Sequence, residues 1–173
     1  NPRQFVPGHP IAGSEKSGIE SVNPFLFEGH QVILTPLPET GPEHTLRIID
    51  LWIGVGATVN QMTAAEHDKI LAATSHLPHM LAYALVDMLS NLRKNQEAFR
   101  YAAGGFSDLT RIAASDPVMW HDIVIANDEA VVSVLSDLSV HIDRIKQAII
   151  LKDSKYLLDV FSRAKETRDN FGK

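Results

Sequence analysis

The chain has 173 residues, of which 45% are hydrophobic and 21% charged, a composition typical of a globular protein with one good core. Its net charge of −5 arises from both signs without a basic run, so neither nucleic acid nor an anionic membrane is expected as a partner. The sequence has no cysteine, no apolar run of about 18 residues and no charged-then-apolar leader, which favours a cytoplasmic protein without disulfides. The start at Asn1-Pro2-Arg3, without Met, suggests a piece of a longer polypeptide.

A single histidine near the start of the chain stands among residues that disfavour a helix. Pro10 pushes His9 into an extended conformation, and Gly8 and Gly13 leave the backbone open to close approach. We therefore expect the His9 imidazole at the end of a strand, facing a loop of small residues and a Glu-Lys pair. This arrangement indicates a functional site rather than a core.

The rest of the first third alternates between strand and helix patterns. Residues 30–35 form an apolar run that predicts a strand, residues 42–54 have helical apolar spacing, and residues 57–60 predict another short strand. Gly54 and Gly56 begin like a dinucleotide fingerprint, but Val59 replaces the third glycine and a helix precedes them. A helix end followed by a strand is the better interpretation. Residues 1–61 are therefore expected to be the C-terminal end of an α/β domain.

From Thr63 onward the sequence predicts helices alone, and we place the domain boundary near Gln61. Residues 63–66 form a capping box that opens a helix running through Leu92, in which Pro78 should bend or break the rod. Further helices are expected to begin at residues 115–117 and 127–129, and a last one covers about 153–170. Residues 62–173 should form one all-helical domain.

Two histidines, His76 and His79, lie three residues apart beside Pro78. In a regular helix both rings would share one face, and His67 and His121 could in principle complete a metal site. No HExxH motif, cysteine or clear carboxylate partner accompanies them, so we expect no metal. Core histidines with satisfied hydrogen bonds are the alternative interpretation.

A glycine pair precedes Asp108 and Arg111, which lie three residues apart. A helical surface ion pair is the default interpretation of this spacing. The alternative is that Gly104 and Gly105 let the backbone turn tightly beside a cavity, where a planar guanidinium binds a carboxylate through two hydrogen bonds.

Three motifs occur in a recognisable order: HPIAGSEKSG at residues 9–18, SHLPH at 75–79 and GGFSDLTRIA at 104–113. They resemble motifs of the prephenate and arogenate dehydrogenases of tyrosine biosynthesis. The resemblance covers nearly the whole chain, although most of that family's N-terminal nucleotide-binding domain has no counterpart in it. It implies a mainly α fold, a helical dimerisation domain preceded by a short α/β remnant of a Rossmann-like domain. The implied reaction converts prephenate to 4-hydroxyphenylpyruvate with NAD or NADP as hydride acceptor.

The resemblance also implies roles for single residues. His9 would accept the substrate's hydroxyl proton, which suits an imidazole with an unperturbed pKa of about 6.5. Arg111 would hold the ring carboxylate, in a motif where this chain has Ala103 and Ser107 instead of the family's frequent third glycine and basic residue. The remaining expected substrate-binding residues are His79 and His76 near the pyruvyl side chain, Ser14 and Glu15 at the pocket mouth, Asp108 beside the arginine, and Trp120 as a wall.

The expected partners are prephenate or arogenate, a second copy of the chain in a homodimer, and L-tyrosine as an inhibitor. One alternative is a cyclohexadienyl dehydrogenase that prefers arogenate. Another is a non-catalytic dimerisation module that binds tyrosine, which the missing nucleotide fingerprint supports. For the same reason we expect these residues alone to be inactive and unable to bind NAD.

Overall fold

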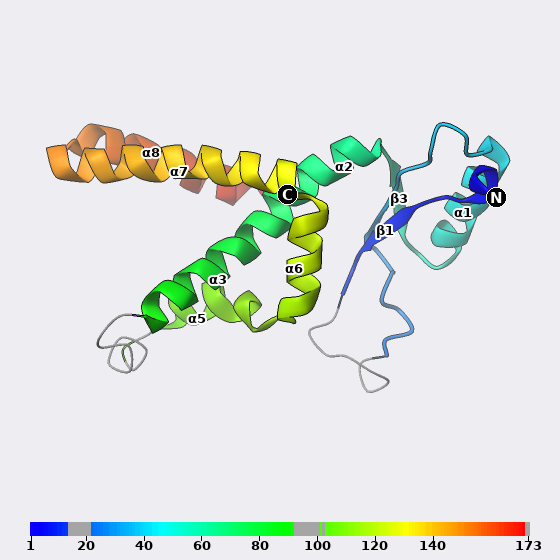
Figure 1. The fold of residues 1–173 in the computed structure, drawn as a ribbon, viewed down its shortest axis with the longest axis horizontal. Coiled ribbons are helices and arrows are strands. Elements are labelled where there is room, and N and C mark those ends of the chain that lie inside the picture. Colours follow the sequence, from blue (N-terminus) through cyan, green and yellow to red (C-terminus); the bar gives the residue numbers. More distant parts are fainter. Residues whose placement is uncertain (14–21, 92–100, 102, 172–173) are drawn as a thin grey trace.

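The computed structural model describes residues 1–13, 22–91, 101 and 103–171, which form a small sheet followed by a larger set of helices (Figure 1). The predicted class, mainly helical with a short α/β portion at the start, is confirmed. Within the described ranges, no helix is both long and apolar enough to cross a membrane.

The sheet has three strands in the order β1-β2-β3. Strand β2 (Gln31–Leu34) is central, with β1 (Gly8–Ile11) antiparallel on one side and β3 (Thr58–Gln61) parallel on the other. Helix α1 (Pro42–Gly54) is the crossover between the two parallel strands. The two predicted strands and the predicted helix are confirmed, with the second strand beginning and ending one residue later than expected.

The first strand corrects one expectation about His9. His9 lies inside β1, opposite Ile33, rather than at the end of a strand. A short 3-10 turn, η1 (Pro2–Gln4), precedes this strand. Since β1 is an edge strand, Pro10 can occupy it without interrupting a central ladder, and its effect on His9 is the extended backbone that the sequence predicts.

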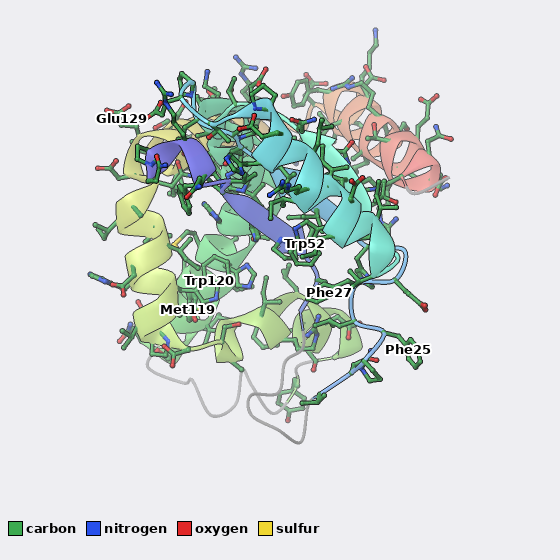
Figure 2. The ribbon with its side chains drawn as sticks, turned by 90° about the vertical axis from the view of Figure 1, so that its right-hand side faces the viewer. Phe25, Phe27, Trp52, Met119, Trp120 and Glu129 are labelled. Atoms are coloured by element: carbon green, nitrogen blue, oxygen red, sulfur yellow. The ribbon has the colours of Figure 1, made fainter. Side chains whose placement is uncertain are left out.

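A small core holds the sheet against α1. Val32 and Leu34 of the central strand are fully buried, and Trp52 of α1 packs against this cluster. The ring of Phe27 meets the Trp52 ring edge-on, with 5.0 Å between centroids (Figure 2). Gly56 turns the chain after α1 with a φ of 85°, so the glycines there belong to a helix end, as predicted, and not to a nucleotide loop.

The capping box predicted at Thr63 is present. The Thr63 hydroxyl accepts a hydrogen bond from the Glu66 backbone N–H, and the Glu66 carboxylate accepts one from the Thr63 N–H. Helix α2 (Ala64–Leu71) runs into a π-helical turn, η3 (Ala72–His76), and then into α3 (Leu77–Ser90). Pro78 lies in the first turn of α3, where a missing N–H is tolerated, and the predicted break is the π turn just before it. Leu92, the expected helix end, lies outside the described residues.

The remaining helices build a bundle and an arm. They are α5 (Gly104–Thr110), the 3-10 turn η4 (Arg111–Ala114), α6 (Pro117–Ala126), α7 (Asp128–Leu151) and α8 (Ser154–Asn170). Asp116 caps α6 by accepting hydrogen bonds from two backbone N–H groups, as predicted. Lys152 reverses the chain in a left-handed conformation, so that α7 and α8 lie side by side as the long arm of Figure 1.

Candidate active site

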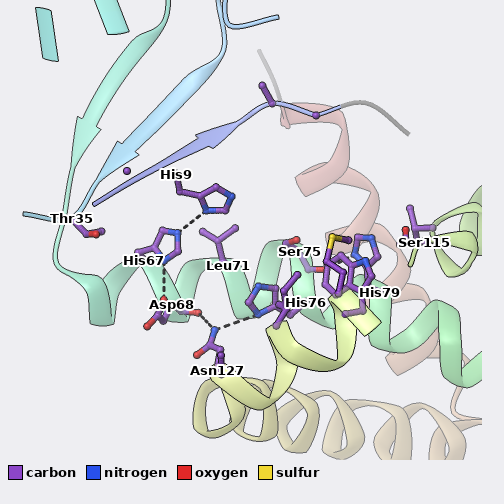
Figure 3. A pocket seen from close by; sticks show the side chains of 18 of the residues that line it. His9, Thr35, His67, Asp68, Leu71, Ser75, His76, His79, Ser115 and Asn127 are labelled. Atoms are coloured by element: carbon purple, nitrogen blue, oxygen red, sulfur yellow. Dashed lines mark hydrogen bonds and ion pairs between the residues drawn. The ribbon is translucent and has the colours of Figure 1, made fainter. Parts of the chain in front are cut away.

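A pocket of about 1250 Å³ lies where the edge strand β1 faces the helices (Figure 3). Its walls come from β1, α2, η3, α3, η4, α6 and the start of α7. Among the described residues that line it, Arg111 is the one permanent cation and Asp68 the one carboxylate. The same wall residues include four histidines: His9, His67, His76 and His79. A pocket with this composition can bind an anion and exchange a proton at one imidazole or more.

His9 projects from β1 toward α2 and meets a second histidine. Its Nδ1 lies 2.8 Å from Nε2 of His67, and the two rings meet edge to face with centroids 5.1 Å apart. Partial burial lowers the pKa of His9 below its usual value of 6.5, and the nearby charge of His67 lowers it further. Both causes favour the neutral imidazole, which is the form that accepts a proton.

His67 is a pocket residue that the sequence analysis does not connect with His9. The sequence suggests it only as a metal ligand, yet its Nδ1 lies 2.8 Å from Oδ1 of Asp68 while its other nitrogen faces His9. Its side chain is 19% exposed and that of Asp68 is 51% exposed. The one sequence signal for the position of His67 is the capping box, because it begins the helix that carries the adjacent His67 and Asp68.

His76 and His79 both line the pocket, and each has a hydrogen-bond partner. The Nδ1 of His79 donates to the Ser75 carbonyl at 2.9 Å, and the Nδ1 of His76 lies 3.3 Å from the Asn127 amide nitrogen. Burial lowers the pKa of His76; nearby Asp68 opposes this shift and the neighbouring histidines add to it. The π turn and the first turn of α3 therefore place these two imidazoles beside the pocket.

Trp120 forms a wall of the pocket from α6. It is only 7% exposed, and its indole stacks on the His79 ring with 3.5 Å between centroids and 20° between planes. Its Nε1 has no hydrogen-bond partner among the described residues. The wall predicted from the sequence thus lies at the pocket, packed against a predicted substrate-binding histidine.

Arg111 and Asp108 differ in their position relative to the pocket. Arg111 lies in η4, is exposed, and lines the pocket, whereas Asp108 on α5 is exposed and is not one of the lining residues. The expectation of a tight glycine turn before them is wrong. Gly104 and Gly105 are the first two residues of α5, neither has a positive φ, and an added Cβ would meet nothing within 4 Å at either position.

Three other sequence expectations concern the pocket mouth, His121 and a metal site. Ser14 and Glu15, predicted at its mouth, lie outside the described residues. His121 is not a lining residue and instead pairs with its exposed neighbour Asp122 at 2.9 Å. In the part of the chain that the structure describes, no group of three or more His, Cys, Asp or Glu side chains is placed to hold a metal ion.

Comparison with known families matches both parts of the chain. Residues 1–61 match the family model described as prephenate dehydrogenase, nucleotide-binding domain, and residues 63–163 match the one described as prephenate dehydrogenase, dimerization domain. These matches define the class of protein, a dehydrogenase with a nucleotide-binding part and a dimerisation part. The chain belongs to the prephenate dehydrogenase family.

Individual relatives agree with this assignment. A cyclohexadienyl dehydrogenase of Zymomonas mobilis is 41% identical over 95% of this chain and 57% of its own length. A prephenate dehydrogenase of Bacillus subtilis is 38% identical over 96% of this chain and 45% of its own length. The crystal structure of Aquifex aeolicus prephenate dehydrogenase with hydroxyphenyl propionate and NAD+ superposes with a TM-score of 0.91 at 39% identity, covering 96% of this chain and 58% of that one. The chain therefore spans about half the length of the curated relatives it matches.

Proposed function

We propose that the native protein containing this chain oxidatively decarboxylates prephenate to 4-hydroxyphenylpyruvate. The observation that carries the proposal is that one pocket holds a neutral-leaning imidazole on β1 and a guanidinium on η4. An acceptor for a hydroxyl proton and a cation for a carboxylate are what this oxidation needs from the protein. The ligand of the A. aeolicus structure, hydroxyphenyl propionate, has the carbon skeleton of the proposed product, which supports the same substrate class.

Small residues line the wall beside His9, where we propose that a nicotinamide ring would bind. Gly8, Ala12 and Gly13 line the pocket there, and an added Cβ at Gly13 would meet nothing within 4 Å. Small residues next to the proposed base leave room for a second planar group. When bound, NAD or NADP supplies the hydride acceptor of the reaction. Family membership supports this cofactor class, because residues 1–61 match a nucleotide-binding domain.

The proton of the substrate's hydroxyl goes to His9. As hydride leaves the ring carbon, the hydroxyl must lose its proton, and a neutral imidazole is able to accept it. The lowered pKa of His9 keeps it in that form near neutral pH. Loss of carbon dioxide then restores aromaticity, so the protein need not supply a strong catalyst for the second half.

Four further side chains orient the substrate. Arg111 binds the ring carboxylate, His76 and His79 lie near the pyruvyl side chain, and Trp120 limits the pocket beside them. Asp108 receives no role because it is exposed and is not one of the residues that line the pocket. The roles of Ser14 and Glu15 at the mouth remain predictions from the sequence.

Preference for arogenate is the second candidate. It is favoured by the cyclohexadienyl dehydrogenase of Z. mobilis and by a Synechocystis arogenate dehydrogenase structure, which superposes with a TM-score of 0.86 at 27% identity, covering 97% of this chain and 62% of that one. Arogenate carries an amino group where prephenate has a keto group, and the imidazoles of His76 and His79 can hydrogen-bond either.

Turnover by the purified native protein tests these proposals. Each substrate is supplied with NAD+ and with NADP+, and reduced cofactor and aromatic product are both measured. Formation of 4-hydroxyphenylpyruvate with the higher kcat/KM supports prephenate, and a higher kcat/KM for arogenate supports the second candidate. Absence of turnover with all four pairs would reject the enzyme and favour the tyrosine-binding module, which calorimetry with L-tyrosine can then examine.

We also propose that the native protein is a homodimer. The helices leave large apolar side chains in water, among them Val132, Ile142 and Ile149 of α7, which are 51–61% exposed. Such a face is typical of a surface that is covered in an assembly. The match to a dimerization domain supports a second copy as the covering partner. Inhibition by L-tyrosine and a cytoplasmic location remain predictions from the sequence.

A further inference from the structure

A hydrogen-bonded chain of side chains lies behind His9 (Figure 3). It runs from Nδ1 of His9 to Nε2 of His67, and from Nδ1 of His67 to Oδ1 of Asp68, with both distances 2.8 Å. A carboxylate only accepts hydrogen bonds, so the proton between His67 and Asp68 belongs to Nδ1 of His67. A neutral imidazole has a single N–H, which leaves Nε2 of His67 as an acceptor. The proton between the two rings therefore belongs to Nδ1 of His9.

We propose that His67 and Asp68 are positioning residues that hold His9 in the tautomer protonated on Nδ1 and unprotonated on Nε2. The inference deepens the proposed function and rests on it for its catalytic meaning. In this tautomer, Nε2 is the nitrogen of His9 that can accept the substrate's hydroxyl proton. In the opposite tautomer Nε2 would carry a hydrogen, and His9 could only donate a hydrogen bond there.

The same series of hydrogen bonds stabilises the positive charge that His9 gains with the proton. Once Nε2 takes the proton, His9 is a cation, and its Nδ1–H bond to His67 becomes charge-assisted. Asp68 places a carboxylate at the far end of the chain, as the aspartate of a Ser-His-Asp triad does behind its histidine. His67 thus connects the proposed base to a negative charge without itself contacting the reacting atoms.

Neighbouring residues hold His67 and Asp68 in place. His67 follows the capping box directly on α2, and its ring is mostly covered. The backbone carbonyl of Asp68 accepts a hydrogen bond from the Asn127 amide at 2.9 Å, which ties α2 to the start of α7. His76 and Arg111 are the other titratable or charged groups that share this pocket with them, together with His79. Burial and the neighbouring His67 lower the pKa of His9, which favours the neutral His9 that the assignment requires.

The tautomer can be measured directly in the native protein. Selective 15N labelling of histidine, with resonances assigned by single replacements, separates a protonated ring nitrogen from a bare one by its chemical shift. We expect His9 to show a protonated Nδ1 and a bare Nε2 at pH values above its pKa. A protonated Nε2 on His9 would overturn the inference, whatever the turnover.

Two replacements of His67 separate hydrogen bonding from shape. His67→Phe keeps a ring but removes the acceptor, so His9 should lose its fixed tautomer and kcat should fall roughly 10- to 100-fold, with KM changing little. His67→Gln loses the ring but can present a carbonyl oxygen near the former Nε2, so it should restore the tautomer and most of kcat. A merely structural role would give the reverse order, with Phe tolerated and Gln not. His121→Phe is the matched control, because His121 pairs with Asp122 in the same way outside the pocket.

Failure of the positioning role and failure of the proposed function can be told apart. Wild-type tautomer and wild-type kcat in His67→Phe would contradict the inference and leave the proposed function standing. A native protein with the expected tautomer, lost in His67→Phe, but with no dehydrogenase activity would support the positioning role and reject the proposed function.

Discussion

Arg111 and His9 face the same pocket, but the proposed reaction requires them in opposite charge states. A guanidinium stays charged at any working pH, whereas the base must be neutral before it accepts a proton. Partial burial and the neighbouring His67 supply that difference by lowering the pKa of His9. The pocket can therefore attract an anionic substrate with one side chain and take its proton with another.

Replacement of Arg111 should weaken substrate binding. Because Arg111 is exposed before substrate binds, we expect Arg111→Ala to cost about 1.5 to 3 kcal/mol, a value typical of a hydrogen bond to a charged group, and to raise KM roughly 10- to 100-fold. Arg111→Lys keeps the charge but loses the planar pair of donors, so its KM should lie between the two. Arg47→Ala, on α1 outside the pocket, is the control for steady-state kinetics. An unchanged KM in Arg111→Ala would leave Arg111 as an ordinary surface residue.

At the scale of elements, the junction from β3 to α2 positions the proposed site. The capping box at Thr63 fixes the start of α2, which carries His67 and Asp68 one turn later. The π turn that follows presents Ser75 and His76 to the pocket before α3 resumes. The first turn of α2 therefore influences both stability and geometry.

Thr63→Ala tests the first of these effects. It removes the hydroxyl that accepts the Glu66 N–H, so the free energy of unfolding should fall by about 1 kcal/mol in chemical denaturation. Thr167→Ala, within α8 and away from any helix start, should change stability far less. Equal effects of the two replacements would show that the cap contributes nothing.

The contribution of the capping box should also depend on pH. Hydrogen bonds from Thr63 lower the pKa of Glu66 below its usual 4.5 in the folded chain. The folded state therefore binds this proton less readily, and the stabilisation is complete above 4.5 and lost as the pH falls through the folded pKa. The difference in unfolding free energy between wild type and Thr63→Ala should shrink in acid. If this difference in unfolding free energy grows as the pH falls, the predicted direction of the pH dependence is wrong.

Elements marked by local sequence signals could be predicted, whereas contacts between residues distant in the sequence could not. Thr63 with Glu66, and Asp116 with Pro117, each mark a helix start through bonds within a few residues, so the sequence alone identifies them. The His9–His67 contact joins residues 58 apart and depends on how β1 packs against α2, which no spacing rule reveals. The glycine pair at 104–105 suggested a tight turn that neither residue adopts, because a glycine permits an unusual turn without requiring one.

At the scale of the whole molecule, the pocket lies between the small sheet and the helical bundle, so each part supplies one half of the proposed chemistry. The sheet provides His9, and the helices provide Arg111 and the other histidines. The arm of α7 and α8 exposes the apolar side chains of α7 described above. These exposed apolar side chains support the proposed dimer.

Sedimentation of the native protein tests the proposed dimer. We expect two copies at micromolar concentration, because the exposed apolar side chains of α7 favour burial against a partner. Ile149→Glu places a charge on that face and should shift the protein toward monomer, whereas Gln147→Glu adds the same charge at an exposed polar position of the same helix and should not. A wild-type protein that sediments as a monomer would refute the proposal.

The most direct test of the central claim, that His9 takes the proton during oxidation, is the pH dependence of turnover in His9→Asn. Asparagine keeps a polar group of similar size but cannot act as the base, so we expect KM to be retained and kcat to fall roughly 100- to 10,000-fold. In the wild type, kcat should decrease as the pH falls through the pKa of His9, which burial and His67 place below 6.5. His9→Asn should lose this acid limb, and His121→Asn should keep both the limb and the wild-type rate. A His9→Asn protein with wild-type kcat and the same acid limb would contradict the account, and the base would then have to be His76 or His79.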